Sequence, residues 1–171
     1  MHFRLCVIIV KAISHTFFCF GFFKENIIYC PLFLFDVMKA CVLYFFQTGN
    51  TRKFAEAISD SLKIPAVFDM TTTEPSVVDD FDVLILGTPV HGFNPSKESL
   101  SFIESLPDGN GKRTILFCTY RLWKGRTFSK LKKTMKKKGY STILAVSKKG
   151  REFHKEDFSE AIGEIVEALK E

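Results

Sequence analysis

The sequence predicts an α/β fold built on a doubly wound parallel sheet, for two reasons. Apolar runs of strand length alternate with segments of helical periodicity, an arrangement typical of successive βαβ units. No series of strands at regular short spacing suggests a sandwich instead. The chain has 171 residues, of which 46% are hydrophobic, so it is long enough for one domain with a sizeable core.

The first predicted unit is a strand followed by a helix. Residues 39–45 are a short apolar run rich in β-formers and predict a buried strand. Residues 52–63 predict a helix because Phe54, Ile58 and Leu62 recur on one face.

The second unit contains a shorter strand and a central one. Residues 65–68 predict the short strand, and at most one helical turn is expected at 76–79. Residues 81–87 are apolar almost throughout, which indicates a strand buried on both faces. The proline and glycine content of 88–95 predicts a loop after it.

The third unit begins at Ser96, which can cap a helix whose apolar face carries Leu100 and Ile103. A fourth strand is predicted at 114–119, with a loop at 120–125.

The last unit begins at Thr127, where a helix with Leu131 and Met135 on its inner face is expected. A fifth strand is predicted at 142–146, and apolar residues from Phe158 to Leu169 predict the final helix.

The stretch Phe46-Gln47-Thr48-Gly49-Asn50-Thr51 lies between the first strand and its helix. Free backbone N–H groups and the helix dipole favour an anion there, above all a phosphate. Three side chains add donors, and Gly49 lets the backbone approach closely. An ordinary helix cap would need only one of those side chains, so residue chemistry alone leaves a phosphate site and a merely well-capped helix open. The stretch is neither a Walker loop nor a Gly-x-Gly-x-x-Gly loop.

This stretch, preceded by Tyr44-Phe45, resembles the FMN-phosphate loop of flavodoxins, usually written Ser/Thr-x-Thr-Gly-Asn-Thr. It departs from that pattern at its first position, where Phe46 stands in place of a hydroxyl residue. The resemblance spans residues 39–170. It implies a flavodoxin-like three-layer fold with a five-stranded parallel sheet in the order 2-1-3-4-5. This order comes from the resemblance alone, because periodicity cannot order strands.

The resemblance also implies a flavoprotein with FMN at the carboxyl ends of strands one, three and four, at the switch point of the sheet. Residues 87–92 resemble the loop that edges the flavin ring, and 119–125 resemble the opposite wall. The FMN-binding residues that we expect are Phe46, Gln47, Thr48, Gly49, Asn50, Thr51, Thr88, Pro89, Val90, His91, Gly92, Phe93, Thr119, Tyr120, Trp123 and Gly125. The alternative for each aromatic is a surface side chain without a ligand, and His91 is alternatively a plain loop histidine.

No catalytic residue and no metal ligand are predicted. The five cysteines form no Cys-x-x-Cys pair, so they encode neither a zinc ribbon nor an iron–sulfur cluster. Cys41 and Cys118 fall within apolar strands and are most simply core residues. A reducing, cytoplasmic location fits this cysteine usage best.

Residues 1–37 differ from the rest of the chain and carry eight of its 19 phenylalanines. Three explanations remain open: a misassigned start with the flavodoxin-like domain at 38–171, an irregular membrane anchor, or an ordered layer on the domain. No apolar run in the extension has the length of a membrane span. Membrane association is therefore not expected unless 1–37 are real and anchor the protein.

The stretch from Arg121 to Lys138 carries nine Lys or Arg residues and no acid. This charge fits a solvated helix face, or a surface that attracts an acidic redox partner of the ferredoxin type. Nucleic acid is not expected as a partner, because no recognised binding motif accompanies the charge.

Three functions are weighed. The first is an FMN-binding protein of electron transport, in which the flavin supplies the chemistry. The second is an oxidoreductase, an FMN-dependent reductase of a quinone, a porphyrin precursor or another small acceptor. The third is an interaction module on the same fold without a flavin.

Overall fold

The computed structural model describes residues 39–47 and 49–170. The predicted boundary between an extension at 1–37 and a domain at 38–171 falls outside the described residues and stays a prediction.

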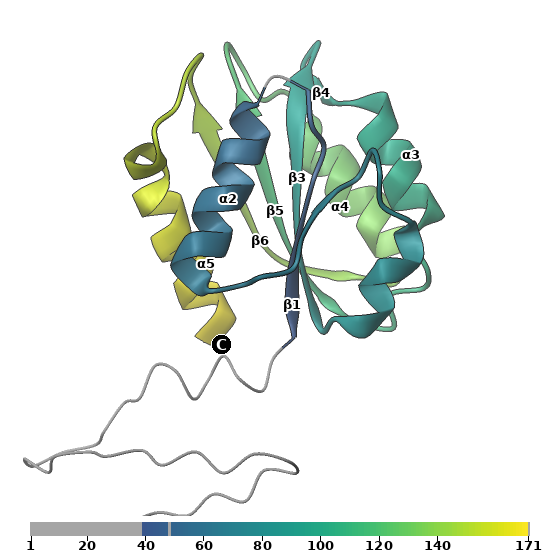
Figure 1. Ribbon diagram of the computed structural model, residues 1–171. Helices are drawn as coiled ribbons and strands as arrows, with labels where there is room; N and C mark the ends of the chain where they lie inside the picture. Colours follow the sequence, from purple (N-terminus) through teal and green to yellow (C-terminus); the bar gives the residue numbers. More distant parts are fainter. Residues whose placement is uncertain (1–38, 48, 171) are drawn as a thin grey trace, which may run out of the picture. The chain divides into compact units, whose positions relative to one another are not determined.

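Five parallel strands form the centre of the domain (Figure 1). In spatial order they are β2 (Val67–Asp69), β1 (Ala40–Tyr44), β3 (Val83–His91), β5 (Arg113–Tyr120) and β6 (Ser141–Lys149). Counted along the chain without the short β4, this is the predicted order 2-1-3-4-5, so the predicted fold class is confirmed. The order reverses between β1 and β3, which makes the space above them the switch point of the sheet.

Helices cover both faces of the sheet, as Figure 1 shows. One face carries α2 (Asn50–Leu62) and α5 (Ser159–Lys170), and the other carries α3 (Lys97–Ser105) and α4 (Thr127–Lys137). Two short 3₁₀ turns, η1 (Pro75–Asp80) and η2 (Lys155–Phe158), complete the connections. The single turn expected at 76–79 is therefore present as η1.

Alternation along the strands divides the core into two clusters. In β1, Val42 and Tyr44 contribute to the cluster under α2 and α5, whereas Cys41 and Leu43 contribute to the cluster under α3 and α4. Successive strand residues point to opposite faces, so a strand that is apolar throughout must be covered on both sides.

The first cluster is centred on stacked aromatic rings. Phe54 of α2 stacks on Phe158 with ring centroids 4.3 Å apart, and its edge meets Phe117 of β5 at 4.9 Å. All three side chains are fully buried. These contacts fix the start of the final helix against α2 and the centre of the sheet.

The prediction of a loop at 88–95 is wrong in its first and last residues. β3 continues through His91, and β4 (Asn94–Pro95) pairs with it in an antiparallel hairpin. Gly92 and Phe93 form the two-residue turn, both with positive φ, 51° and 64°. Pro89 is compatible with the strand because the parallel pairing of β3 with β5 ends at that residue, where no further N–H is needed.

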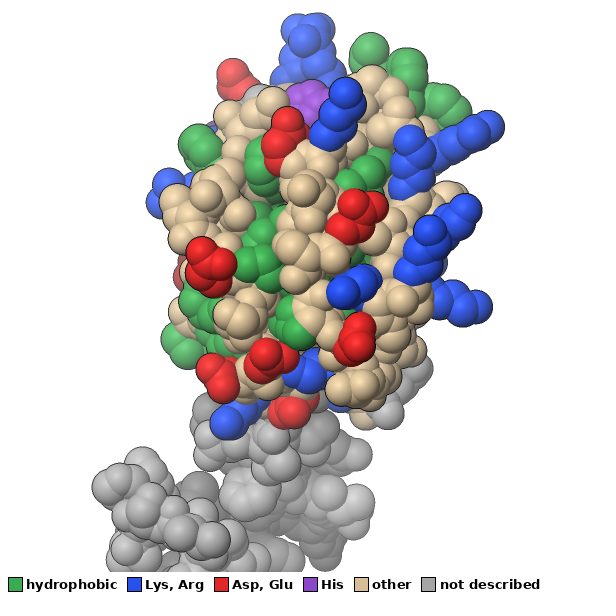
Figure 2. All heavy atoms as spheres, turned by 90° about the vertical axis from the view of Figure 1, so that its right-hand side faces the viewer, with side chains coloured by type: hydrophobic (Ala, Val, Ile, Leu, Met, Phe, Trp, Pro, Cys, Tyr) green, Lys and Arg blue, Asp and Glu red, His purple; other side chains and the backbone are tan. Residues whose placement is uncertain are grey.

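Charge is distributed unevenly over the surface. Figure 2 shows Lys and Arg side chains projecting along one edge of the face turned toward the viewer, while acidic side chains are scattered over the rest of that face. The exposed lysines of α4 are Lys130, Lys132, Lys133, Lys136 and Lys137. Among the described residues, no helix is long and apolar enough to cross a bilayer.

Candidate functional site

A cleft of about 460 Å³ opens where β1, β3, β5 and β6 end. Its volume falls within the range of small-molecule sites. The lining comes from four separate segments of the chain: Asn50, Pro89, Val90, His91, Thr119, Tyr120, Arg121, Gly150 and Arg151. Six of these nine residues are among the predicted site residues.

The floor of the cleft includes the N-terminus of α2. The helix begins at Asn50, two residues earlier than predicted, so Asn50 and Thr51 belong to its first turn. Gly49 precedes them with φ of 81° and ψ of −23°, a left-handed conformation that favours glycine. A glycine has no side chain to cap the helix, so the first backbone N–H groups remain available to an anion.

The side chains of this first turn hold the walls of the cleft together. Asn50 Nδ2 donates to the carbonyl oxygen of Arg151 at 2.7 Å. The hydroxyls of Thr51 and Thr119 are hydrogen-bonded at 3.0 Å, and both residues are buried. One turn further on, Lys53 Nζ donates to the carbonyl oxygen of Phe153 at 3.3 Å. The helix start is thereby fixed to β5 and to the segment after β6.

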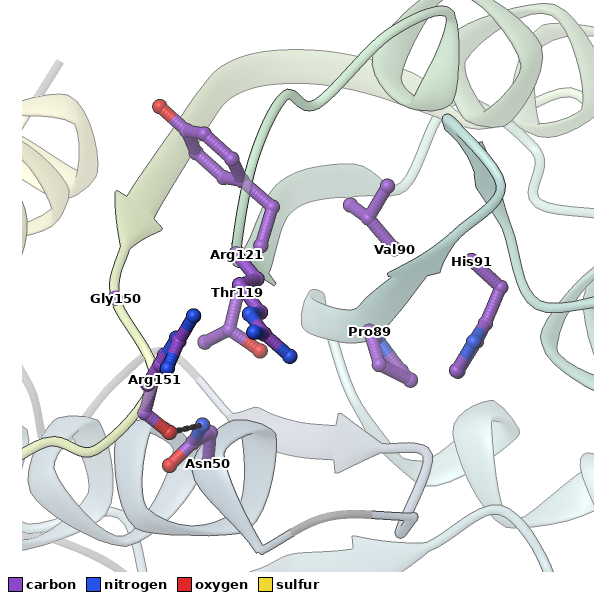
Figure 3. A pocket seen from close by; sticks show the side chains of 9 residues that line it. Asn50, Pro89, Val90, His91, Thr119, Arg121, Gly150 and Arg151 are labelled. Atoms are coloured by element: carbon purple, nitrogen blue, oxygen red, sulfur yellow. Dashed lines mark hydrogen bonds between the residues drawn. The ribbon is translucent and has the colours of Figure 1, made fainter.

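The end of β3 forms the opposite wall. Figure 3 shows Pro89, Val90 and His91 on one side of the cleft, facing Thr119, Arg121 and Arg151. His91 Nε2 and Gln47 Oε1 form a hydrogen bond between this wall and the segment after β1. Of the predicted walls, 87–92 and 119–125, the residues Pro89–His91 and Thr119–Tyr120 line this cleft.

Three lining residues were absent from the predicted set: Arg121, Gly150 and Arg151. Within the described part of the chain, neither arginine forms an ion pair, so both guanidinium groups are available to an anionic ligand. Gly150 N–H donates to the carbonyl oxygen of Tyr120 at 2.9 Å, which joins the segments after β5 and β6. The rule that ligands gather at carboxyl strand ends, applied to the fifth strand as well, would have identified this segment.

The structure separates four predicted residues from the cleft. Gly92, Phe93, Trp123 and Gly125 line a second cavity of about 510 Å³, which includes the turn of the β3–β4 hairpin. Because Trp123 is absent from the lining of the first cleft, it does not cover that cleft.

Among the described residues, the predicted Thr88 and Phe46 are also absent from the cleft lining, as are Gln47, Gly49 and Thr51 described above. Thr88 is buried, and its hydroxyl donates to Ser99 Oγ of α3 at 2.9 Å, on the face of the sheet that α3 covers. Phe46 is 44% exposed. Thr48 lies outside the described residues.

Of the two described cysteines, Cys118 of β5 directly precedes Thr119 of the cleft lining and is a buried free cysteine. Burial raises the pKa of this thiol to about 12, against a smaller lowering effect of Lys124. Burial likewise raises the pKa of Cys41 to about 12. Neither thiol is a thiolate at neutral pH, so neither is activated as a nucleophile. Among the described residues, no group of three or more His, Cys, Asp or Glu side chains could hold a metal ion.

A family model described as a flavodoxin domain matches residues 41–146. This span contains β1 to β5, both predicted walls and most of β6. The comparison with curated proteins gave no significant match.

Solved structures with the same fold include two flavodoxins that the chain covers almost completely. A flavodoxin from the domain Archaea has a TM-score of 0.62 and 23% identity, over 78% of this chain and 100% of that one. The two-electron reduced flavodoxin of Megasphaera elsdenii has a TM-score of 0.62 and 23% identity, over 77% and 99%. A flavodoxin-type WrbA-like protein from Agrobacterium tumefaciens has a TM-score of 0.59 and 17% identity, over 78% and 96%.

Proposed function

Because this chain belongs to the flavodoxin domain family, which implies a flavin cofactor and a redox role, we propose that it binds FMN in the cleft and carries electrons. The observation that carries this proposal is the position of the cleft. It opens at the switch point of the sheet and includes both the N-terminus of α2 and the ends of β3 and β5.

The phosphate of FMN is proposed to lie at the N-terminus of α2. Gly49 allows close approach, and the N–H groups of the first helical turn donate to phosphate oxygens. Asn50 positions the Arg151 segment beside this turn, and the guanidinium of Arg151 adds positive charge. Thr51 acts mainly through its bond to Thr119, because its hydroxyl is buried and already partnered. Thr48, whose position is not described, is kept as a proposed phosphate ligand from the motif.

The flavin ring is proposed to lie between the Pro89–His91 wall and the Thr119–Arg121 wall. Their surface is largely apolar around a few polar groups, the composition expected of a cofactor site. Tyr120 offers an aromatic face for stacking, and Arg121 offers a positive charge. Bound flavin supplies the acceptance and release of electrons, while these residues hold the ring and limit its contact with water.

An electron carrier delivers to another protein, and we propose a partner with an acidic surface, of the ferredoxin type. The support for this is charge, since the segment after β5 and helix α4 carry nine basic residues and no acid between Arg121 and Lys138. We also propose a cytoplasmic location, from the cysteine usage alone.

The test is a titration of the flavin-free chain with FMN and, in parallel, with riboflavin, which lacks the phosphate. Flavin fluorescence and the absorption spectrum report binding. FMN should bind at least about tenfold more tightly than riboflavin. A factor of ten in affinity corresponds to roughly 1.4 kcal/mol, about the contribution of one charge-assisted hydrogen bond to the phosphate. Equal affinities would exclude the phosphate site, and the absence of any binding would favour an interaction module without a flavin.

One observation favours a second function, an FMN-dependent reductase of a quinone, a porphyrin precursor or another small acceptor. Such an enzyme needs an open space above the flavin ring, and Trp123 lies in the second cavity instead of above the first. Turnover of NAD(P)H with a quinone by the FMN-loaded protein distinguishes the two functions. Sustained turnover indicates a reductase, and its absence together with rapid exchange of electrons with ferredoxin indicates a carrier.

A further inference from the structure

The second cavity is bordered by two aromatic rings at the tip of the domain. Phe93 and Trp123 lie with ring centroids 5.4 Å apart, a tilted aromatic pair. The two rings are 48% and 62% exposed, and the neighbouring Leu122 is 72% exposed. Exposed apolar side chains grouped in this way, beside a cavity of about 510 Å³, are typical of an interaction surface.

The main chain holds this aromatic pair in place. Phe93 has φ of 64°, an unusual conformation for a bulky residue, and the surroundings must stabilise it. Arg126 N–H donates to the carbonyl oxygen of Phe93 at 3.0 Å. Gly125 lies so close that a Cβ atom there would be 2.2 Å from the same oxygen. The rings are therefore presented on a rigid support, which lowers the entropic cost of binding.

Basic side chains surround the aromatic pair. Arg126 and Lys130 line the second cavity together with the polar Asn94, and no acid lines it. Helix α3, which follows β4, carries Glu98 and Glu104, both exposed and both outside the lining. Figure 2 shows exposed hydrophobic side chains next to basic ones at the top of the face in view.

We propose that this surface, formed by Phe93, Trp123, Arg126 and Lys130, is the docking site for an acidic redox protein. The inference rests on the proposed function and assigns its partner site. An apolar side chain of the partner enters the second cavity against the aromatic pair, and carboxylates around it face Arg126 and Lys130. The proposed function attributed the attraction of an acidic partner to charge alone. The docking site adds an apolar contact, the aromatic pair of Phe93 and Trp123, to that charge.

The position of the surface favours a redox protein over other anionic partners. Both cavities are lined by residues of the β3–β4 hairpin, the cleft by Val90 and His91 and the second cavity by Gly92 and Phe93. A protein docked at the second cavity therefore lies against the hairpin that also lines the cleft. If the chain holds fully reduced FMN, the flavin would supply two electrons in succession, each reducing one oxidised iron–sulfur centre of a partner molecule, and would release two protons to water.

The test measures dissociation constants between the full FMN-loaded chain and an oxidised acidic two-iron ferredoxin, by calorimetry at two salt concentrations. The variants are W123A and K130E, and the matched control is K137E, the same charge reversal near the other end of α4. We expect W123A and K130E each to raise the dissociation constant about tenfold or more, as removal of a central anchor does. K137E should change it by less than about threefold, the effect of a charge at the rim. Higher salt should weaken the unaltered complex more than the K130E complex.

Equal effects of K130E and K137E would overturn the docking site, as would a chain that does not bind the ferredoxin. Binding of anionic vesicles or of a single-stranded oligonucleotide that depends on Trp123 and Lys130, without ferredoxin binding, would assign the surface to a membrane or a nucleic acid instead. An FMN titration of the same samples separates the two proposals. Failure to bind FMN refutes the proposed function, while the docking constants remain measurable on the flavin-free chain.

Discussion

Aromatic side chains in the interior of the sheet and those at its carboxyl edge differ in what they contact. In the interior, Phe54, Phe117 and Phe158 are fully buried and meet one another ring to ring. At the edge, Phe93 and Trp123 contact each other but keep about half or more of their surface exposed. The interior rings bury one another's apolar surface, whereas the edge rings leave apolar surface that only a ligand or another protein can cover.

Polar groups show the same contrast. Within the walls of the cleft, the hydroxyls of Thr51 and Thr119 form a hydrogen bond, and both residues are buried. Around the opening, the backbone N–H groups at the start of α2 and the guanidinium groups of Arg121 and Arg151 face the cleft without an anionic partner among the described residues. Substitutions in the interior should therefore change stability, and substitutions at the edge should change binding.

The largest expected effect is on stability, from F54A. Loss of the ring leaves a cavity between α2, β5 and η2, so the free energy of unfolding should fall by about 3–5 kcal/mol. Chemical denaturation measures this. The control is L122A at the edge, where a side chain that is 72% exposed should change stability by no more than about 0.5 kcal/mol. Similar losses in the two variants would erase the contrast between the two regions.

Gly125 lies at the carboxyl edge of the sheet, but a substitution there should lower stability, as substitutions in the interior do. Its φ is 53°, and an added Cβ would collide with the main chain of Phe93. We expect G125A to lower the free energy of unfolding by about 1–3 kcal/mol, as overpacking does. The control is G163A in α5, where an added Cβ meets nothing within 4 Å and should stabilise the helix by about 0.5–1 kcal/mol. If G125A left the free energy of unfolding unchanged, the hairpin would not be held as tightly as its contacts imply.

At the cleft, N50A should weaken the binding of FMN and leave the affinity for riboflavin largely unchanged. The variant removes the bond to the carbonyl of Arg151 beside the helix start, and FMN affinity should fall by about 1–3 kcal/mol. Parallel flavin titrations provide the measurement, with riboflavin as the control because it carries no phosphate. Equal losses for both flavins would place the effect of Asn50 away from the phosphate.

The smallest effect concerns the buried thiols and appears only at high pH. Burial raises the pKa values of Cys41 and Cys118 from 9.0 to about 12. Between these values the folded state binds more protons than the unfolded state, so this contribution to stability is complete below pH 9 and is lost as the pH rises toward 12. Thiol labelling with peptide mapping at about pH 10, between the two pKa values, should leave both cysteines unmodified in the folded protein and modify them in denaturant. Rapid labelling of either one in the folded state would contradict the burial.

The sequence allowed the layered fold to be predicted because its apolar periods are strong. Strands β1 and β5 lie within one or two residues of their predicted ends, since both are buried runs bounded by polar residues. The end of β3 was predicted wrongly because Pro89 and Gly92 are usual breakers of strands. The turn Gly92-Phe93 has no sequence signature, because a two-residue hairpin turn of this geometry favours asparagine or glycine at its second position.

The cleft could be predicted only in part. The loop after β1 was found through its motif, and the loops after β3 and β5 through their place at the strand ends. Arg121 and Arg151 carry no motif, and arginines in exposed segments are common. Trp123 was expected to form a wall of the flavin site, but sequence alone could not show that this residue lines a second cavity and not the cleft.

The contact between Phe54 and Phe158 also bears on how the chain is made. The two rings are separated by more than a hundred residues of sequence, and the cluster to which they belong also needs Ile165 and Leu169 of α5. During synthesis β1, α2 and the central strands leave the ribosome long before these partners do. The face of the sheet under α2 and α5 therefore stays open until α5 emerges, and this half of the core can form only after that point of synthesis.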